Sequence, residues 1–168
     1  MHLRLLSAGF FLAMLAGCFG SLPPAQSHEK ILMDGRWVEP RINRNLSRRP
    51  EEVYYVYLDS SGNYVRHGTD LHFYLDGQIK LEEHYRDGLL DSVSEFWYPS
   101  GAKRGELPYS EGKPDGKALT WYSDGMKESE TNWKNGQLDG LSLRWNEKGD
   151  LIKKTLWSGN HIDTAGSH

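Results

Sequence analysis

The sequence predicts an all-β fold built from tandem hairpins, and three patterns support this prediction. A unit of 24 residues recurs in one register four times, at residues 67–90, 91–114, 115–138 and 139–162. Within each unit, apolar and polar residues alternate with period two, which is typical of β-strands. Glycines end the alternating stretches, where tight turns are expected. A fixed period of this length marks a repeat architecture whose units stack on their neighbours.

The two central units show the repeat most clearly. Trp97-Tyr98 in one unit corresponds to Trp121-Tyr122 in the next, and Tyr109 corresponds to Trp133. Further matched positions are Gly101 with Gly125, Glu106 with Glu130, and Gly112 with Gly136. Ten of the 18 glycines fall on the period, namely Gly68, Gly77, Gly88, Gly101, Gly112, Gly116, Gly125, Gly136, Gly140 and Gly149. We therefore interpret the glycines as turn residues of a folded repeat and not as a low-complexity tract.

Each unit is expected to contain two strands and two turns. In the third unit, residues 117–122 and 128–133 alternate as strands, and Ser123-Asp124-Gly125 separates them. Asn135-Gly136 follows the second strand, and this dipeptide favours tight hairpin turns because both residues tolerate positive φ. The repeat region has no helical apolar stripe.

Aromatic residues recur on both strands of the predicted hairpin. One row contains Phe73, Trp97, Trp121 and Trp145, and the other contains Tyr85, Tyr109, Trp133 and Trp157. We expect most of these rings to be buried, but a single-layer sheet cannot hide both of its faces. A solvent-facing row would form a platform for a glycan, a peptide or a partner protein. The candidate binding surface comprises Trp97, Tyr98, Tyr109, Trp121, Tyr122, Trp133, Trp145 and Trp157.

The amino-terminal residues 1–17 have the layout of a secretory signal, with His2 and Arg4 before an apolar run from Leu5 to Leu15. This run is shorter than the roughly 20 residues that a spanning helix needs. Leu15-Ala16-Gly17-Cys18 resembles the lipobox of bacterial lipoproteins. The resemblance implies cleavage before Cys18, lipidation of its thiol and acylation of the new amino terminus, including by palmitate. An ordinary cleaved signal with an incidental cysteine is the alternative.

A lipidated Cys18 would hold the mature protein on a membrane, because each buried CH₂ of an acyl chain contributes about 0.8 kcal/mol. Phe19 follows the cysteine, where an aspartate would signal inner-membrane retention in enteric lipoproteins. By that family rule we expect the periplasmic face of the outer membrane.

The segments that flank the repeats are expected to differ from them. Residues 18–52 are interpreted as the lipidated cysteine and a tether, in which residues 31–40 are compatible with a short hairpin around Asp34-Gly35. Four arginines within residues 41–49 are expected to be solvated, although they could also contact anionic headgroups. Residues 53–66 are interpreted as a degenerate capping unit, and residues 163–168 as a flexible tail.

The residues show no pattern that predicts catalysis, a cofactor or a metal. The chain is 26% charged with a formal net charge of -3, which does not suggest nucleic-acid binding. His67, His72 and His84 could approach one another near Asp70, but they lack a recognised metal-ligand spacing, so we expect ordinary surface histidines. Glu82, Glu106 and Glu130 recur at the period, which favours salt bridges or turn support over catalytic carboxylates, since an active site is normally one place.

The aromatic pair, turn glycines, glutamate and Asp-Gly of each unit resemble the MORN-repeat variant of bacterial YwqK-type proteins, over about residues 53–160. The resemblance implies an elongated, twisted antiparallel sheet of successive hairpins. The units depart from the pattern at Ser92, where the next unit has Gly116, at Asn146, where the others have tyrosine, and at Lys154, where they have glutamate.

We expect a non-enzymatic, membrane-anchored interaction scaffold at the bacterial cell envelope, with a protein partner. Many members of the family carry an antitoxin label, so an antitoxin or immunity protein that neutralises a toxin is an alternative. Binding of glycan or peptidoglycan through exposed aromatic rows is a second alternative.

Overall fold

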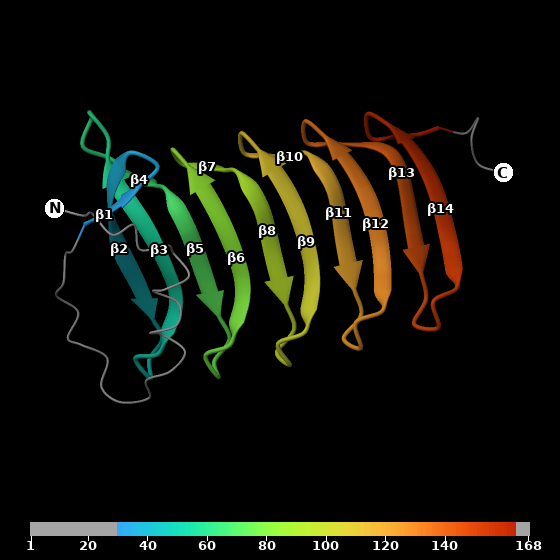
Figure 1. Cartoon of the computed structure of the whole chain (residues 1–168), viewed down its shortest axis with the longest axis horizontal. Coiled ribbons are helices and arrows are strands. Elements are labelled where there is room, and N and C mark those ends of the chain that lie inside the picture. Colours follow the sequence, from blue (N-terminus) through green and yellow to red (C-terminus); the bar gives the residue numbers. More distant parts are fainter. Residues whose placement is uncertain (1–29, 164–168) are drawn as a thin grey trace, which may run out of the picture.

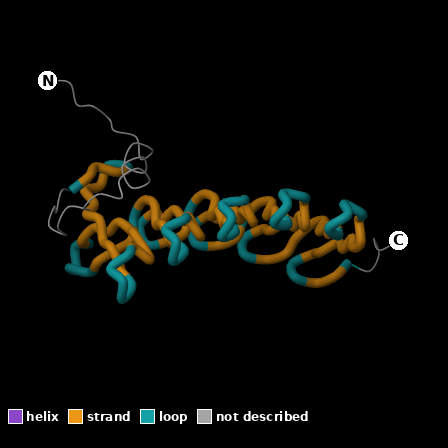
Figure 2. Tube along the Cα trace, turned by 90° about the horizontal axis from the view of Figure 1, so that it is seen from below, coloured by secondary structure: helices purple, strands orange, loops and turns teal. Residues whose placement is uncertain are grey.

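The computed structural model describes residues 30–163, and these residues form one open antiparallel sheet of 15 strands. The strands stand side by side along the long axis of the molecule (Figure 1), and the view turned by 90° shows one narrow layer (Figure 2). Residues 30–163 contain no helix, so none that is long and apolar enough to cross a membrane. The predicted all-β fold of tandem hairpins is confirmed.

The strands follow one another across the sheet in the order of the sequence, apart from three short strands beside the main path. Their bounds are β1 Ile31–Met33, β2 Arg36–Arg44, β3 Pro50–Leu58, β4 Tyr64–Arg66, β5 Gly68–Phe73, β6 Ile79–Arg86, β7 Leu89–Leu90, β8 Ser92–Trp97, β9 Lys103–Ser110, β10 Lys113–Pro114, β11 Gly116–Trp121, β12 Lys127–Lys134, β13 Gln137–Trp145, β14 Leu151–Ser158 and β15 His161–Ile162. The short strands β4, β7 and β10 pair with β3, β6 and β9. Sequential pairing of this kind needs only short connections.

Turns of two kinds join the strands and alternate along the chain, and the turn after β12 is an example of one kind. After β12, Asn135 and Gly136 have φ values of 49° and 83°, which is the type I′ geometry that suits the twist of a hairpin. The amide of Gly136 also donates a hydrogen bond of 2.8 Å to the carbonyl of Pro114. This turn therefore closes its own hairpin and contacts the preceding one.

A register shift recurs at the same place in every repeat. It lies directly before Phe73, Trp97, Trp121 and Trp145 in the pairing of each hairpin. A β-bulge of this kind increases the local twist of the strands. The 24-residue period is therefore visible in the backbone pairing as well as in the residue types.

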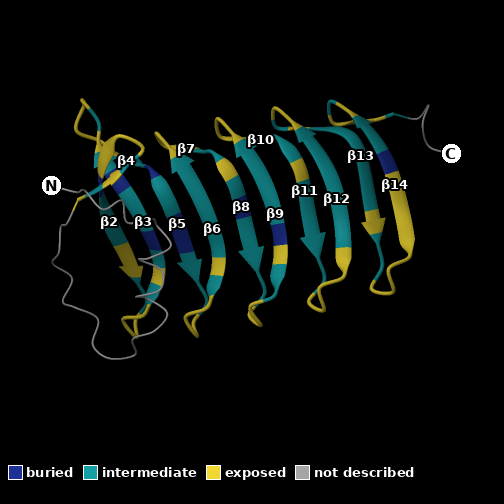
Figure 3. Ribbon diagram, in the orientation of Figure 1, coloured by how far each residue is buried: buried dark blue, intermediate teal, exposed yellow. Residues whose placement is uncertain are grey.

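The fully buried apolar side chains gather at the amino-terminal end of the sheet. Among residues 30–163 they are Val38, Val53, Val56 and Leu71, on β2, β3 and β5. The repeats that follow are mostly half-buried on both faces (Figure 3). Their stability must come from strand pairing and from contacts between neighbouring hairpins, as in other repeat proteins.

The sheet extends further toward the amino terminus than the sequence indicated. Residues 41–44 and 50–52, which the sequence predicts as part of a tether, belong to the paired strands β2 and β3. The guanidinium of Arg41 lies 4.4 Å from the centre of the Tyr64 ring, so at least one of the expected solvated arginines packs on the sheet. A short hairpin joins β1 to β2 through Asp34-Gly35. The predicted signal segment, Cys18 and the first part of the tether lie outside the described residues, as does most of the predicted tail.

Candidate functional site

The cross-strand register shows which side chains share a face of the sheet. Residues paired across strands lie on one face, as do alternate residues along a strand. Glu95 pairs with Glu106, and Leu119 pairs with both Glu106 and Glu130. Because Trp97 and Trp121 stand two residues beyond this row, they lie on the same face. We call this the glutamate face, and it carries Phe73, Trp97, Trp121 and Trp145.

The second aromatic row lies on the opposite face. Ser92 stands three residues before Glu95, an odd spacing that places it on the other side, and it pairs with Tyr109. In the other repeats the corresponding pairs are Gly68 with Tyr85, Gly116 with Trp133, and Gly140 with Trp157. We call this the glycine face. The two rows of rings therefore point away from each other and cannot form one joint platform.

All eight residues of the candidate binding surface are partly exposed, and none is fully buried. The expectation that most of the rings are buried is therefore wrong. The reason is that residues 30–163 form one layer, with no second layer to cover either face. On the glycine face, moreover, three rings stand opposite glycines, which offer no side chain to cover them.

The tyrosine of each Trp-Tyr pair joins its hairpin to the next one. The hydroxyl of Tyr98 donates a hydrogen bond of 2.8 Å to the carbonyl of Trp121, 23 residues further on. Tyr74 makes the same bond to Trp97 at 2.7 Å, and Tyr122 makes it to Trp145 at 2.8 Å. The hydroxyls of Tyr98 and Tyr122 thus have a structural role. Within each Trp-Tyr pair, the tryptophan is therefore a better candidate for a ligand contact than the tyrosine.

Asn146 departs from the tyrosine pattern because its repeat has no further hairpin to contact within the described sheet. Its side-chain oxygen instead accepts hydrogen bonds from the amides of Lys148 at 2.9 Å and Asp150 at 3.0 Å. This short side chain closes its own turn, as asparagine commonly does.

Lysines lie over two tryptophan rings of the glutamate face. Lys103 Nζ is 5.5 Å from the centre of the Trp121 ring, and Lys127 Nζ is 5.3 Å from that of Trp145. Each lysine belongs to the repeat before the ring that it covers. At these distances a cation–π attraction is expected, worth about 0.5–1 kcal/mol where the groups are exposed. The glutamate face therefore combines half-exposed rings with ammonium groups.

The same lysines compensate the glutamate row. Lys103 Nζ donates to Glu95 Oε1 at 2.6 Å and to Glu106 Oε2 at 2.5 Å. Burial lowers the pKa of Lys103, but its hydrogen bonds to the two glutamates outweigh this and hold the pKa above its usual value. Glu130 is paired with Lys117 and Lys127, and Glu82 lies 3.5 Å from the ring of His84. The predicted salt-bridging role of Glu82, Glu106 and Glu130 agrees with these contacts.

The three histidines of the first repeat occupy different environments. His67 is only 2% exposed, so the expectation of a surface position is wrong for it. Its Nδ1 accepts a hydrogen bond of 3.2 Å from the amide of Asp87, and its ring packs edge-on against Tyr57 at 5.8 Å. His84 lies on the glutamate face beside Glu82. His72 lies on the glycine face, so the structure does not bring the three together.

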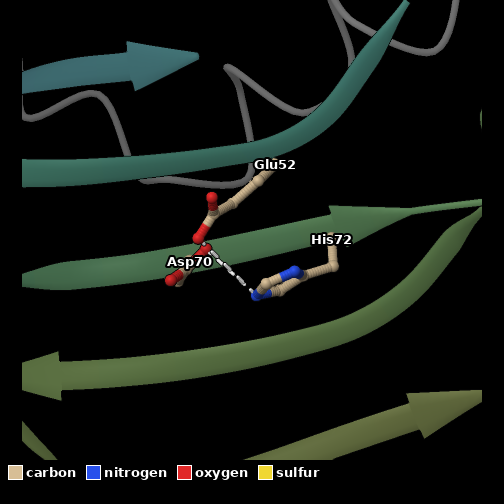
Figure 4. A group of neighbouring side chains, drawn as sticks. All are labelled: Glu52, Asp70 and His72. Atoms are coloured by element: carbon tan, nitrogen blue, oxygen red, sulfur yellow. Dashed lines mark ion pairs between the residues drawn. The ribbon is translucent and has the colours of Figure 1, made fainter. Parts of the chain in front are cut away.

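His72 instead joins a group of carboxylates around Asp70. Glu52, Asp70 and His72 offer ligand atoms that all lie within 4.8 Å of one another, and Figure 4 shows Asp70 and His72 facing each other. Arg66 donates to Asp70 Oδ2, and also to Glu52 Oε1 at 2.7 Å. Burial raises the pKa of Asp70 to about 6, against the opposing attraction of Arg66 and His72.

The sequence predicted only part of this cluster. Asp70 and His72 were recognised as neighbours, but Glu52 belongs to the segment before the repeats, where no period gives its register. The pairing of Glu52 with His72 across β3 and β5 places Glu52 in the cluster. The one signal that could have indicated this is the alternation of Val53, Tyr55 and Tyr57 with Glu52 and Tyr54, which puts Glu52 on a defined side of its strand.

A model of the MORN repeat variant family matches the chain twice, at residues 66–87 and 114–135. The chain carries MORN repeats. The matches cover the hairpin of β5 and β6 and the hairpin of β11 and β12, and they begin two 24-residue periods apart. A search of curated proteins found no match to the chain. MORN repeats favour a repeat-based binding scaffold as the general role of this protein.

Proposed function

We propose that this MORN-repeat protein is a non-enzymatic scaffold, anchored by lipid at the bacterial cell envelope, that binds a protein partner. The observation that carries the proposal is the row of half-exposed rings at a fixed period on each face of a single-layer sheet. Half-exposed tryptophans are common in the centres of protein interfaces, because they bury a large area at low entropic cost. A sheet with an uncovered face on each side offers such rows without rearrangement.

The glutamate face is our first choice for the binding surface. Trp121 and Trp145 there have lysines above their rings, and the row of glutamates lies beside them on the same face. A partner could therefore bury the rings and pair with charges of both signs at the rim, which is the usual organisation of a protein interface.

The proposed anchor is supported by the sequence Leu15-Ala16-Gly17-Cys18 at the end of an apolar leader. Two or more acyl chains hold a protein firmly on a bilayer. We expect the mature protein to stay in the membrane fraction after washes in high salt and at alkaline pH. We expect a Cys18→Ser variant to be released, and release of the unsubstituted protein by salt alone would refute the anchor.

The binding face can be mapped by crosslinking in intact cells. A photoreactive amino acid is placed at Lys117 on the glutamate face, at Lys153 on the glycine face, or at Leu75 in a turn, all of which are exposed. We expect one discrete crosslinked product from Lys117, and little from Lys153 or Leu75. If neither Lys117 nor Lys153 gives a discrete product, the scaffold proposal is contradicted.

If the captured partner is a toxin and the protein blocks its activity, then the scaffold function is that of an antitoxin.

Binding of cell-wall glycan is a second candidate, favoured by the spacing of tryptophans along the sheet. It predicts that the purified protein sediments with isolated peptidoglycan, and that Trp121→Ala or Trp133→Ala weakens sedimentation. Trp37→Ala is the matched control, because Trp37 is 62% exposed but stands outside both rows. Protein that remains in the supernatant would exclude this candidate.

A further inference from the structure

Four titratable side chains meet on the glycine face where β3, β5 and β6 lie side by side. Glu52 pairs with His72 across β3 and β5, and Asp70 pairs with Glu83 across β5 and β6. His72 Nε2 lies 3.5 Å from Asp70 Oδ1, 3.9 Å from Glu52 Oε1 and 4.0 Å from Glu83 Oε2. One imidazole nitrogen is thus surrounded by three carboxylates.

We propose that Glu52, Asp70, His72 and Glu83 form a binding site for a divalent first-row transition metal such as Zn²⁺. This site is independent of the proposed scaffold function. Imidazole nitrogen and carboxylate oxygen are ligands that zinc accepts, at about 2.0–2.2 Å. In a tetrahedral site of that size, two ligand atoms stand about 3.4 Å apart. The separations from His72 Nε2 exceed this by a few tenths of an ångström. Glu52, Asp70 and His72 already lie within 4.8 Å of one another, whereas Glu83 lies outside that group and must turn toward it for all four side chains to bind.

Asp70 gives independent support, because it is a buried carboxylate with an unused oxygen. Its side chain is 1% exposed, and Oδ1 has no hydrogen-bond partner although Oδ2 accepts from Arg66. A buried carboxylate oxygen without a hydrogen bond is costly and calls for an explanation. Of the carboxylate oxygens paired with His72 Nε2, Asp70 Oδ1 is the closest, and it is not the oxygen that accepts from Arg66.

The charge of the cluster also suits a divalent cation. The three carboxyl side chains of the cluster, those of Glu52, Asp70 and Glu83, outnumber its one guanidinium, that of Arg66, by two formal negative charges. A cation of charge +2 would balance them. Arg66 holds Glu52 and Asp70 from outside the proposed ligand set, through hydrogen bonds to Glu52 Oε1 and Asp70 Oδ2. Such outer contacts commonly orient metal ligands.

The strands give the site a fixed geometry. Each ligand stands within or at the edge of paired backbone, on β3 for Glu52, β5 for Asp70 and His72, and β6 for Glu83. Two of these strands, β3 and β5, carry three of the four fully buried apolar side chains described above, Val53, Val56 and Leu71. This is the best-packed region of the described sheet, and it limits the entropic cost of holding the ligands together.

The test is calorimetric titration of ZnCl₂ into the untagged full chain in detergent, after removal of metal with a chelator. A Cys18→Ser background excludes the thiol as a ligand. We expect one bound Zn²⁺ per chain and a rise in the melting temperature, because a cation that binds only the folded state stabilises it. His72→Gln should weaken binding at least about tenfold and abolish the rise in melting temperature.

The matched control is His84→Gln in the same hairpin. His84 is exposed to a similar extent, 36% against 32% for His72, but it lies on the opposite face beside one carboxylate, Glu82. We expect this variant to bind Zn²⁺ as the parent does. His72 is half-exposed, so its variant should fold, which a circular dichroism spectrum without zinc checks. Equal zinc binding by the parent and His72→Gln, or no binding by either, would overturn the proposal and leave His72 as a simple ion-pair partner of the carboxylates.

Discussion

The hydroxyl of Tyr98 donates a hydrogen bond of 2.8 Å to the carbonyl of Trp121, and so ties one hairpin to the next across a single-layer sheet. The same bond recurs one period earlier and one period later. In a repeat protein without a second layer, contacts between neighbouring units determine whether the array unfolds as one body. Side-chain bonds of this kind strengthen those contacts.

We predict that Tyr98→Phe lowers the free energy of unfolding by about 1 kcal/mol, because the variant loses a partly buried hydrogen bond. Urea denaturation followed by tryptophan fluorescence measures the change. Tyr109→Phe is the control, since the same atom is removed from a hydroxyl that makes no hydrogen bond within residues 30–163. Equal losses in the two variants would show that the inter-repeat bond contributes nothing.

Ser92→Gly is expected to stabilise the protein. Ser92 has a φ of 87°, a conformation that L-residues rarely adopt, whereas the corresponding residue in the next unit is Gly116 with a φ of 120°. Relief of this strain outweighs the greater freedom of glycine in the unfolded chain, so we expect a net gain of about 0.5–1 kcal/mol. Thermal and urea denaturation measure it.

The reverse change, Gly116→Ser, should be destabilising. A Cβ at Gly116 would lie 3.2 Å from Cβ and Cγ of Pro108, in addition to the strain of the positive φ. A Ser92→Gly variant that is less stable than the parent would contradict this interpretation of the departure at Ser92.

Lys103→Met is expected to destabilise the glutamate face. Lys103 bridges Glu95 and Glu106, which stand directly opposite each other on β8 and β9. Without the ammonium group two like charges face each other, and such pairs are unfavourable. Because all three groups are about one-third exposed, solvent screening limits the loss to about 1 kcal/mol. The loss should shrink in high salt, and Lys153→Met, which removes no ion pair within the described sheet, should cost less.

The stabilising effect of Glu130 should depend on pH. A hydrogen bond from Lys117 lowers the pKa of Glu130 below its usual 4.5. A carboxyl group whose pKa is lower in the folded protein than in the unfolded chain stabilises the fold. This stabilisation is fully present above the pKa of the unfolded chain and is lost as the pH falls through the pKa of the folded protein. Glu130→Gln should therefore be less stable than the parent at pH 7, and the difference should disappear well below pH 4.5. A difference that persists at low pH would show that the charge is not responsible.

The strands and turns of the repeats could be predicted from the sequence, because period-two alternation and dipeptides such as Asn135-Gly136 act locally. The opposite orientation of the two aromatic rows depends on cross-strand register and bulges, which the analysis of one strand does not reveal. The bond from Tyr98 to Trp121 joins separate hairpins and has no local signal. The Glu52 contact with Asp70 and His72 is less predictable still, since Glu52 lies outside the repeating units.

The most direct test of the modular architecture is the removal of one whole unit. Deletion of residues 91–114 joins Leu90 to Asp115 in an equivalent register, and Tyr74 can then donate to the carbonyl of Trp121 in place of that of Trp97. We predict a folded protein with a strand-type circular dichroism spectrum and one cooperative, somewhat less stable unfolding transition. Deletion of residues 97–108, half a period, should abolish that transition. If both deletions unfold or aggregate alike, the account of interchangeable 24-residue hairpins is wrong.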